Sequence, residues 1–307
     1  MATILGVVAP VFAIVAFGWL AASRRMIDEA GFRGLNSFTF NIAAPALLFA
    51  GGTSPHQGGG FAAVLYFAAS VLVFALGVLI ARRGLAKDLG AASLFALNAA
   101  FGNTVMMGIP LVVAAYGEAG LVILISILAL HSMVLLSLAT VVAEIGLNAS
   151  ASWPRVLRAT VLGVARNPVV VTVFVAFIWH MLDLPVPGPM RRTLELLGAA
   201  APGTALFCLG ASLTGFHLAG ALREVAWLTV LKLLVMPALV WGICRFAGLG
   251  ALETAVAGTT AALPTGANAF LLARRYAIGA EASGATVLAS TLVSVLTLTV
   301  VLAWFQG

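Results

Sequence analysis

Charged residues are scarce in this sequence. Only 8% of its 307 residues are Asp, Glu, Lys or Arg, whereas 62% are hydrophobic. Soluble domains usually carry about a quarter of charged residues, so this composition excludes a soluble globular protein. Apolar runs of about twenty residues recur along the whole chain, and runs of this length predict membrane spans.

Cysteine is almost absent. Cys208 and Cys244 both fall inside apolar runs and form no CxxC pair, which excludes a disulfide framework and predicts two small buried side chains. No cofactor and no metal site is expected. A basic segment is also missing before the first apolar run, 2–22, although Ala21-Ala22-Ser23 resembles a cleavage context. Signal peptides begin with such a segment, so this run is expected to stay as the first span.

No acidic residue lies in the middle of an apolar run. The ten Asp and Glu residues fall in predicted loops or at the ends of spans. Proton and sodium relays usually keep a carboxylate at mid-membrane depth, so strong coupling through a buried acid is not expected. Sodium held by backbone carbonyls remains open.

Catalytic motifs are missing as well. Neither HExxH nor GxSxG occurs in the chain. An intramembrane enzyme would need His131 or His180 together with a serine, but no nucleophile, base and orienting acid share a helical spacing. The chain is therefore not expected to be an enzyme.

Ten apolar segments can be drawn as spans, which predicts an all-α membrane protein with ten transmembrane helices. The second and sixth segments are short for a span. The predicted spans are 2–22, 35–50, 60–81, 90–116, 120–143, 163–182, 195–215, 223–246, 251–277 and 281–305.

Basic residues gather on one side of these spans. The loops after the odd-numbered spans hold most of the 16 Lys and Arg residues, and the positive-inside rule places that side in the cytoplasm and both termini outside. The net charge of +6 is thus a topology signal, and no nucleic-acid partner is expected. The residues on this side are Arg24, Arg25, Arg33, Arg82, Arg83, Lys87, Arg155, Arg158, Arg166, Arg223, Arg274 and Arg275.

The two halves of the chain echo each other. Three pairs of segments recur at offsets of 157 to 160 residues: Ala9-Pro10 with Asn167-Pro168, Pro45 with Pro202, and Leu111–Tyr116 with Leu271–Tyr276. Because a repeat of five spans is odd-numbered, the second copy must be inverted, as in many secondary transporters. This predicts a first repeat at 1–143, a short cytoplasmic linker at 144–162 and a second repeat at 163–307.

Spans 4 and 9 are both interrupted at mid-length. Segment 102–110 is GNTVMMGIP and segment 261–270 is AALPTGANAF. Proline frees backbone groups, which in hydrocarbon need a protein partner or a water-lined cavity. Half-helix N-termini and Asn amides at such breaks suit a carboxylate, whereas kinks that only help packing are the alternative. The candidate substrate-binding residues are Asn103, Thr104, Gly108, Pro110, Pro264, Thr265, Gly266 and Asn268, with Asn41 and Asn98 as further polar residues inside spans.

These segments carry a resemblance to a known family. Asn103–Pro110 with Tyr116-Gly117, and Ala261–Phe270, are similar to the fourth-span and ninth-span motifs of the auxin efflux carrier family. That family includes plant auxin exporters and bacterial carriers assigned to malonate or malate. The resemblance covers essentially the whole chain, without the long central loop of many plant members. Further similar segments are Arg166-Asn167-Pro168, Leu206–Gly210 and Lys232–Pro237.

The resemblance implies a scaffold of spans 1, 2, 6 and 7 and a transport domain of spans 3–5 and 8–10. Spans 4 and 9 would cross at their prolines, bind a carboxylate there and move it by an elevator-like shift. Members often form homodimers through the scaffold. Asn103 matches the family's carboxylate-contacting asparagine, whereas Asn268 departs from the apolar residue usual in plants and favours a smaller, more polar acid than auxin.

Two ionisable residues lie deep within spans. Lys232 is nine residues past Arg223, about 13 Å into a hydrocarbon core about 30 Å thick. A charge there is costly, so it predicts charge compensation or stabilisation of the transport domain, unless the side chain snorkels to the cytoplasmic face. His131, in span 5, is either a proton switch or a neutral hydrogen-bonded core histidine.

Together these features predict a secondary transporter of a small carboxylate in the inner membrane, with the lipid bilayer as its surroundings. The cell interior is negative, and one charge crossing gains about 2.3 kcal/mol per 100 mV, so an uncoupled anion carrier exports. A proton- or sodium-coupled importer of malonate or malate is the alternative. From another class, a non-transporting membrane receptor is also open.

Overall fold

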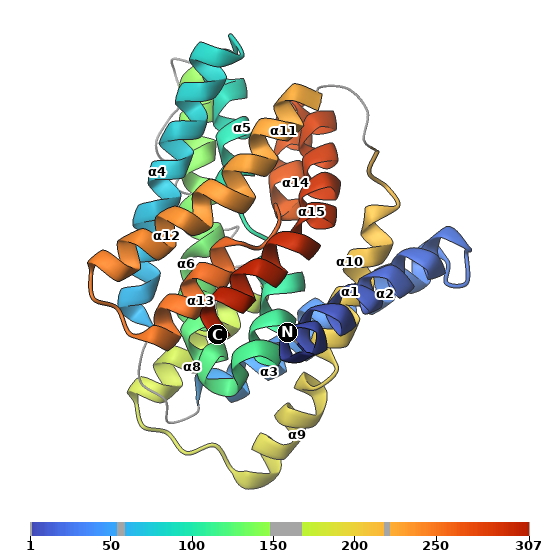
Figure 1. Ribbon diagram of the computed structural model, residues 1–307. Helices are drawn as coiled ribbons and strands as arrows, with labels where there is room; N and C mark the ends of the chain where they lie inside the picture. Colours follow the sequence, from blue (N-terminus) through green and yellow to red (C-terminus); the bar gives the residue numbers. More distant parts are fainter. Residues whose placement is uncertain (1, 54–58, 148–167, 218–221, 307) are drawn as a thin grey trace.

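The computed structural model describes residues 2–53, 59–147, 168–217 and 222–306 (Figure 1). Within these ranges the chain is helical, with turns and one isolated β-bridge and no strand. The linker predicted at 144–162 lies almost wholly outside the described residues, as do Asn167 and the three arginines Arg155, Arg158 and Arg166.

In the described part of the chain, five helical stretches are long and apolar enough to cross a membrane. Three shorter apolar helices accompany them, at Val8–Ser23, Leu89–Ala100 and Pro168–Met181. Large apolar side chains such as Phe177, Leu296 and Trp304 are exposed on these helices, as lipid contact allows. The five long stretches are Gly60–Gly84, Thr104–Leu147, Gly188–Leu213, Leu222–Phe246 and Ala280–Phe305.

The first half of the chain corrects one predicted boundary. The segment predicted as a short second span at 35–50 lies in a longer helical run from Glu29 to Gly52, whose start the Asp28 carboxylate caps by accepting from Gly31 N–H at 2.7 Å. The first turns of this run are polar, so the apolar pattern of the sequence did not reveal where the helix starts. The elements are α1 (Ala2–Ser23), α2 (Glu29–Phe38), the π-helical turn η1 (Thr39–Ala43), α3 (Ala44–Gly52), α4 (Gly60–Gly84), α5 (Leu89–Ala100), the π-helical turn η2 (Thr104–Gly108) and α6 (Ile109–Leu147).

Within α6, Gly117 has φ 63° and ψ −155°, a backbone conformation that glycine tolerates. This residue separates the end of predicted span 4 from predicted span 5.

In the second half, each segment predicted as a span contains helix within the described residues. The helical stretch that covers the predicted seventh span starts at Gly188, seven residues before the predicted 195, because α9 leads almost directly into α10. The elements are α8 (Pro168–Met181), α9 (Gly188–Gly198), α10 (Ala201–Leu213), α11 (Leu222–Val230), the π-helical turn η3 (Leu231–Val235), α12 (Met236–Phe246), α13 (Ala251–Ala261), α14 (Ala267–Tyr276) and α15 (Ala280–Gln306).

Two helices from the predicted scaffold, α1 and α10, pack backbone against backbone (Figure 1). A Cβ atom at Gly18 would collide with the carbonyl of Phe207, and a Cβ atom at Gly210 would collide with the carbonyl of Val15. Small residues allow such close approach of helices in membranes. Cys208 lies on α10 and Cys244 on α12, and both are buried and free, as predicted.

An apolar seam separates α1 and α10 from the broken helices and α15. We use this name for one cluster of buried side chains, against which Met106, Tyr116, Phe216 and Phe270 pack. The members of the seam are Val8, Val11, Val15, Met107, Leu111, Leu206, Leu209, Leu213, Ala262, Leu263, Val287, Leu298 and Leu302.

Candidate functional site

The two helix breaks lie against each other and pair through their backbones. Gly102 and Thr265 form an isolated antiparallel bridge. Asn103 N–H donates to the Pro264 carbonyl at 2.8 Å, and Gly266 N–H donates to the Phe101 carbonyl at 3.0 Å. These bonds satisfy backbone groups that the interrupted helices leave free, as an apolar surrounding requires. We call this junction the crossing.

Glycines at the crossing permit close approach of the two segments. A Cβ atom at Gly266 would stand 2.9 Å from the Gly102 carbonyl oxygen, and one at Gly108 would stand 2.9 Å from Leu263 Cδ1. Both glycines were predicted as substrate contacts. In the structure, each leaves room for close packing of the other broken segment. The Pro264 carbonyl accepts from Asn103 beside the bridge, whereas Pro110 is the second residue of α6, which begins directly after the π-helical turn η2.

Four half-helix ends meet at the crossing. The carbonyl ends of α5 and α13 point to it, and the N–H ends of η2 and α14 begin from it. Helix N-termini carry partial positive charge and favour anions, whereas C-terminal ends favour cations. The crossing therefore offers two chemically different faces.

The Asn103 side chain brings to the crossing a polar group that lacks a partner within the described part of the chain, as does His131 with its Nδ1. Asn103 is 6% exposed, and its Nδ2 is buried with no hydrogen-bond partner among the described residues. A buried amide left unsatisfied costs about 1–3 kcal/mol. Thr104, buried beside it, begins η2. A ligand with an acceptor oxygen would satisfy Asn103 next to a helix N-terminus.

The side chain of Thr265 is already engaged within the protein. Its hydroxyl donates to the Asn98 carbonyl at 2.9 Å, and its backbone N–H donates to Ser290 Oγ at 3.0 Å. The Asn98 side chain in turn accepts from Ser283 Oγ at 2.7 Å. Thr265, predicted to bind substrate, thus ties the break to α5 and α15.

Lys232 and His131 approach the carbonyl face of the crossing. Lys232 is fully buried and its Nζ donates to the Ala261 carbonyl, at the end of α13, at 2.6 Å. His131 Nε2 lies 3.2 Å from the Gly102 carbonyl oxygen, so a protonated Nε2 donates to it. The snorkelling alternative for Lys232 is therefore wrong. The sequence did not predict that either base reaches this junction. The position of a residue along its own span does not show which other helix its side chain contacts.

Lys232 has no carboxylate near it. All ten acidic residues lie in described parts of the chain, and none is buried. A cation at a helix C-terminus is stabilised by the helix dipole, and Lys232 sits in the π-helical turn η3, a feature frequent at functional sites. The structure therefore places this charge where it supports the end of α13.

Two predicted site residues, Asn41 and Asn268, are exposed, whereas Asn103 is buried. Asn41 is exposed, and its Nδ2 donates to Ser37 O at 2.9 Å and to Ser37 Oγ at 3.0 Å within its own helical run. Asn268 is exposed in the first turn of α14. Since a helix turns by 100° per residue, Phe270 faces the seam and Asn268 faces away from it.

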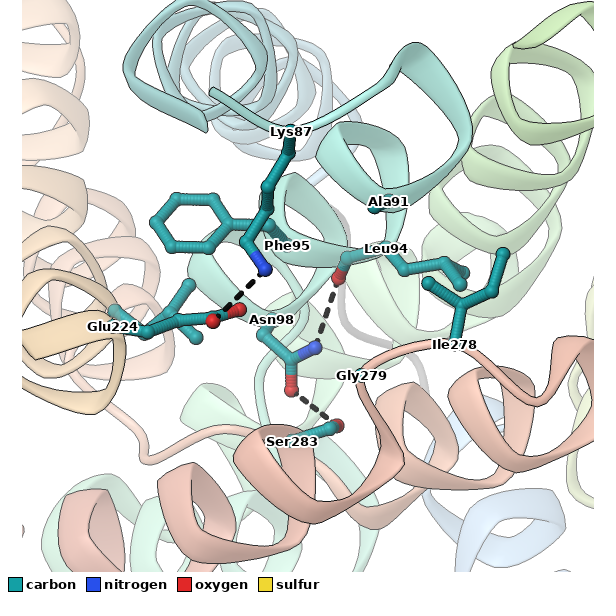
Figure 2. A pocket seen from close by; sticks show the side chains of 10 residues that line it. Lys87, Ala91, Leu94, Phe95, Asn98, Glu224, Ile278, Gly279 and Ser283 are labelled. Carbon is teal, nitrogen blue, oxygen red and sulfur yellow. Dashed lines mark hydrogen bonds and ion pairs between the residues drawn. The ribbon is translucent and has the colours of Figure 1, made fainter. Parts of the chain in front are cut away.

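A small cleft lies between α5, α11 and the start of α15 (Figure 2). Its volume is about 10 Å³, which is room for about one water molecule. Lys87 and Glu224 close it with an ion pair of 2.9 Å, and Asn98 and Ser283 lie at its inner end. This pairing has no signal in the sequence, because Lys87 and Glu224 belong to different halves of the chain and share no motif.

The Lys87–Glu224 pair is expected to contribute measurably to stability. The two side chains are 23% and 13% exposed, so water screens them less than a surface pair. A double-mutant cycle with Lys87→Ala and Glu224→Ala, measured by chemical unfolding in detergent, should give a coupling of about 1–2 kcal/mol.

The Arg192–Glu195 pair, at 3.8 Å with 74% and 47% exposed side chains, is the matched control. Its coupling should stay below about 0.5 kcal/mol. Equal coupling for both pairs would contradict the expected effect of burial.

Comparison with known proteins defines the class of this chain. The profile of the membrane transport protein family, the family of the auxin efflux carriers, matches residues 3–302. The chain belongs to this family, as its fourth- and ninth-span motifs predicted. It is therefore a multi-pass membrane transporter and not an enzyme.

Particular relatives narrow the comparison. A protein of Rhizobium meliloti (strain 1021) named "Putative malonate transporter" is 29% identical over 97% of this chain and 95% of its own length. The "Uncharacterized transporter YfdV" of Escherichia coli (strain K12) is 24% identical over 95% of each chain. The "Lysosomal cholesterol signaling protein" of Mus musculus is 30% identical over 74% of this chain, but only 28% of the mouse protein is covered.

Proposed function

We propose that this transporter carries a small carboxylate across the inner membrane and exports it down the membrane potential. The observation that carries the proposal is the buried amide of Asn103, which has no partner among the described residues and lies beside the N-terminus of η2. A carboxylate oxygen accepts from such an amide and is favoured by the helix dipole. Thr104 is the adjacent side chain that would share the anion.

The architecture proposed for this function is two inverted repeats of five spans, with both termini outside. The repeated segments and the basic loops support it. The scaffold would comprise α1 to α3 and α8 to α10, and the transport domain the remaining helices. An apolar seam between the two bodies suits an elevator-type slide, because its contacts are non-directional. Homodimerisation through the scaffold is part of the same proposal.

Malonate is the first substrate to test. The Rhizobium relative carries malonate in its name and aligns over nearly the full length of both chains. Malate and simple monocarboxylates belong in the same panel.

Potential-driven export follows from the charges inside the protein. No acidic residue is buried, and all ten lie in described parts of the chain, so a carboxylate relay for protons or sodium has no residue to use. Lys232 is a buried base whose Nζ donates to the Ala261 carbonyl. An uncoupled anion carrier moves its cargo toward the positive side of the membrane.

Proteoliposomes test this directly. With labelled malonate and a potassium–valinomycin potential, malonate should accumulate on the positive side, and collapsing the potential should abolish accumulation. A potential of 100 mV corresponds to about 2.3 kcal/mol per charge, or about a 50-fold concentration ratio for a monovalent species. Accumulation driven by a pH or sodium gradient alone would instead support the coupled importer.

A receptor is the second candidate, because the mouse relative is named as a signalling protein. That similarity covers a minor part of the mouse protein, whereas the relatives named as transporters align from end to end. Carboxylate binding that depends on Asn103, without any flux in the same vesicles, would favour the receptor.

A further inference from the structure

The cytoplasmic end of the apolar seam carries an aromatic pair from opposite sides. Phe216 follows α10, on the scaffold side, and Phe270 lies on α14, the half-helix that leaves the crossing. Their ring centroids are 5.0 Å apart at an interplanar angle of 86°, an edge-to-face contact. Both rings pack against the seam.

A glycine in a third helix leaves room for this pair of rings. A Cβ atom at Gly284, in the first turns of α15, would stand 2.9 Å from Phe216 Cδ1 and 3.4 Å from Phe270 Cδ2. The two rings therefore fill the space where α10, α14 and α15 meet. Any side chain at 284 would push them apart.

The pair lies between the crossing and the cytoplasm. α14 begins at the crossing, and Phe270 is four residues beyond Gly266, about 6 Å along the helix axis. The last turn of α14 carries Arg274 and Arg275, which belong to the side assigned to the cytoplasm. A solute that leaves Asn103 along the seam on this side meets the two rings.

Arg274 holds Phe270 from the cytoplasmic side. Its guanidinium carbon lies 5.7 Å from the Phe270 ring centroid, a cation–π contact. In the described part of the chain no carboxylate lies within ion-pair distance of Arg274. Its positive charge is thus presented at the mouth of the seam, where an anion would arrive or depart.

We propose that Phe216 and Phe270 form the cytoplasmic gate of this transporter, and that Arg274 keeps Phe270 in the closed position. The inference rests on the proposed transport route through the crossing. Opening requires the two rings to separate, because one ring belongs to the scaffold side and the other to the moving half-helix. Relative motion of the two bodies along the seam would therefore open the gate without a separate lid.

Thiol accessibility tests the gate without any cargo. In a background with Cys208→Ala and Cys244→Ala, the substitution Ala267→Cys places a probe at the start of α14, one turn before Phe270. A membrane-impermeant methanethiosulfonate is added to the cytoplasmic side of inside-out vesicles. We expect slow labelling with the gate intact and about tenfold faster labelling with Phe270→Ala or Phe216→Ala, because an edge-to-face pair shifts the closed population by about that factor.

Matched variants separate the gate from general loosening. Arg274→Gln should accelerate labelling about threefold through loss of the cation–π contact, whereas its neighbour variant Arg275→Gln should change nothing. A second probe, Ala92→Cys in the buried part of α5, should stay unreactive in every variant. Unchanged labelling of Ala267→Cys in both phenylalanine variants, with Ala92→Cys silent, overturns the gate.

The outcome is independent of the proposed function's own test. Labelling needs no substrate, so failure of the gate leaves carboxylate binding at Asn103 standing. Conversely, absence of malonate binding would contradict the proposed function but would not change the labelling rates that test the gate. A reactive Ala92→Cys in both phenylalanine variants would show that the rings hold the fold together and would also overturn a gating role.

Discussion

Replacing Asn103 by alanine is expected to weaken carboxylate binding about 10- to 100-fold, because a hydrogen bond to a charged group contributes about 1.5–3 kcal/mol. The same substitution should leave the unfolding temperature of the substrate-free protein nearly unchanged. The buried Nδ2 has no partner among the described residues, so its removal breaks no bond of that atom. Loss of binding without loss of stability is typical of a ligand contact.

Asn41→Ala is the matched control for this experiment. Asn41 is also an asparagine inside a span, but its amide donates to Ser37 within its own helical run. A thermal-shift titration with malonate, malate and a set of monocarboxylates would measure both variants. If Asn103→Ala binds as tightly as the unmodified protein, or if Asn41→Ala loses as much affinity, the carboxylate site does not lie at the crossing.

Gly210→Ala is expected to destabilise the protein strongly, because it adds a methyl group where α10 packs against the backbone of α1. The new Cβ would collide with the Val15 carbonyl and stand 2.8 Å from Trp19 N, and backbone cannot move aside as a side chain can. Overpacking costs about 1–3 kcal/mol in ordinary cores, and a clash with backbone belongs at the upper end of this range. α1 and α10 would have to separate, and the packing of their side chains in the seam would be lost.

Gly203→Ala, in the same helix, provides the comparison. A Cβ atom there meets nothing within 4 Å, so the variant should be neutral or slightly stabilising, since alanine favours the helix. Gly18→Ala should resemble Gly210→Ala, and the double variant should cost less than the sum, because the helices need to separate only once. Chemical unfolding in detergent measures all four, and equal stability of the Gly203 and Gly210 variants would contradict the close packing.

The crossing shows which part of the site was predictable. Asn103 and Pro264 were predicted from local features, since proline and glycine in the middle of an apolar span interrupt the helix wherever the span packs. The matching positions of the breaks predicted their meeting. Phe270 belongs to the same motif, but its partner Phe216 has no sequence signal, because only the approach of α10 to α14 brings the rings together.

For Lys232, depth within the span predicted less than the structure shows. Its position in the span predicted a functional or structural role, but not its acceptor, the Ala261 carbonyl. That contact depends on the side of span 8 on which the side chain emerges and on the π-helical turn η3. Likewise, an apolar span in lipid has no polar face from which the orientation of Asn41 or Asn268 could be deduced, and both residues are exposed.

The sequence by itself determined the class of this protein, the side on which its basic loops gather and the two places where helices must break. These properties depend on composition and on local backbone chemistry, which act within one span. Only the tertiary structure decided which polar groups meet at the crossing, which glycines serve packing and which rings close the seam. Such choices depend on contacts between residues far apart in the chain, and in a uniformly apolar sequence no periodic pattern encodes them.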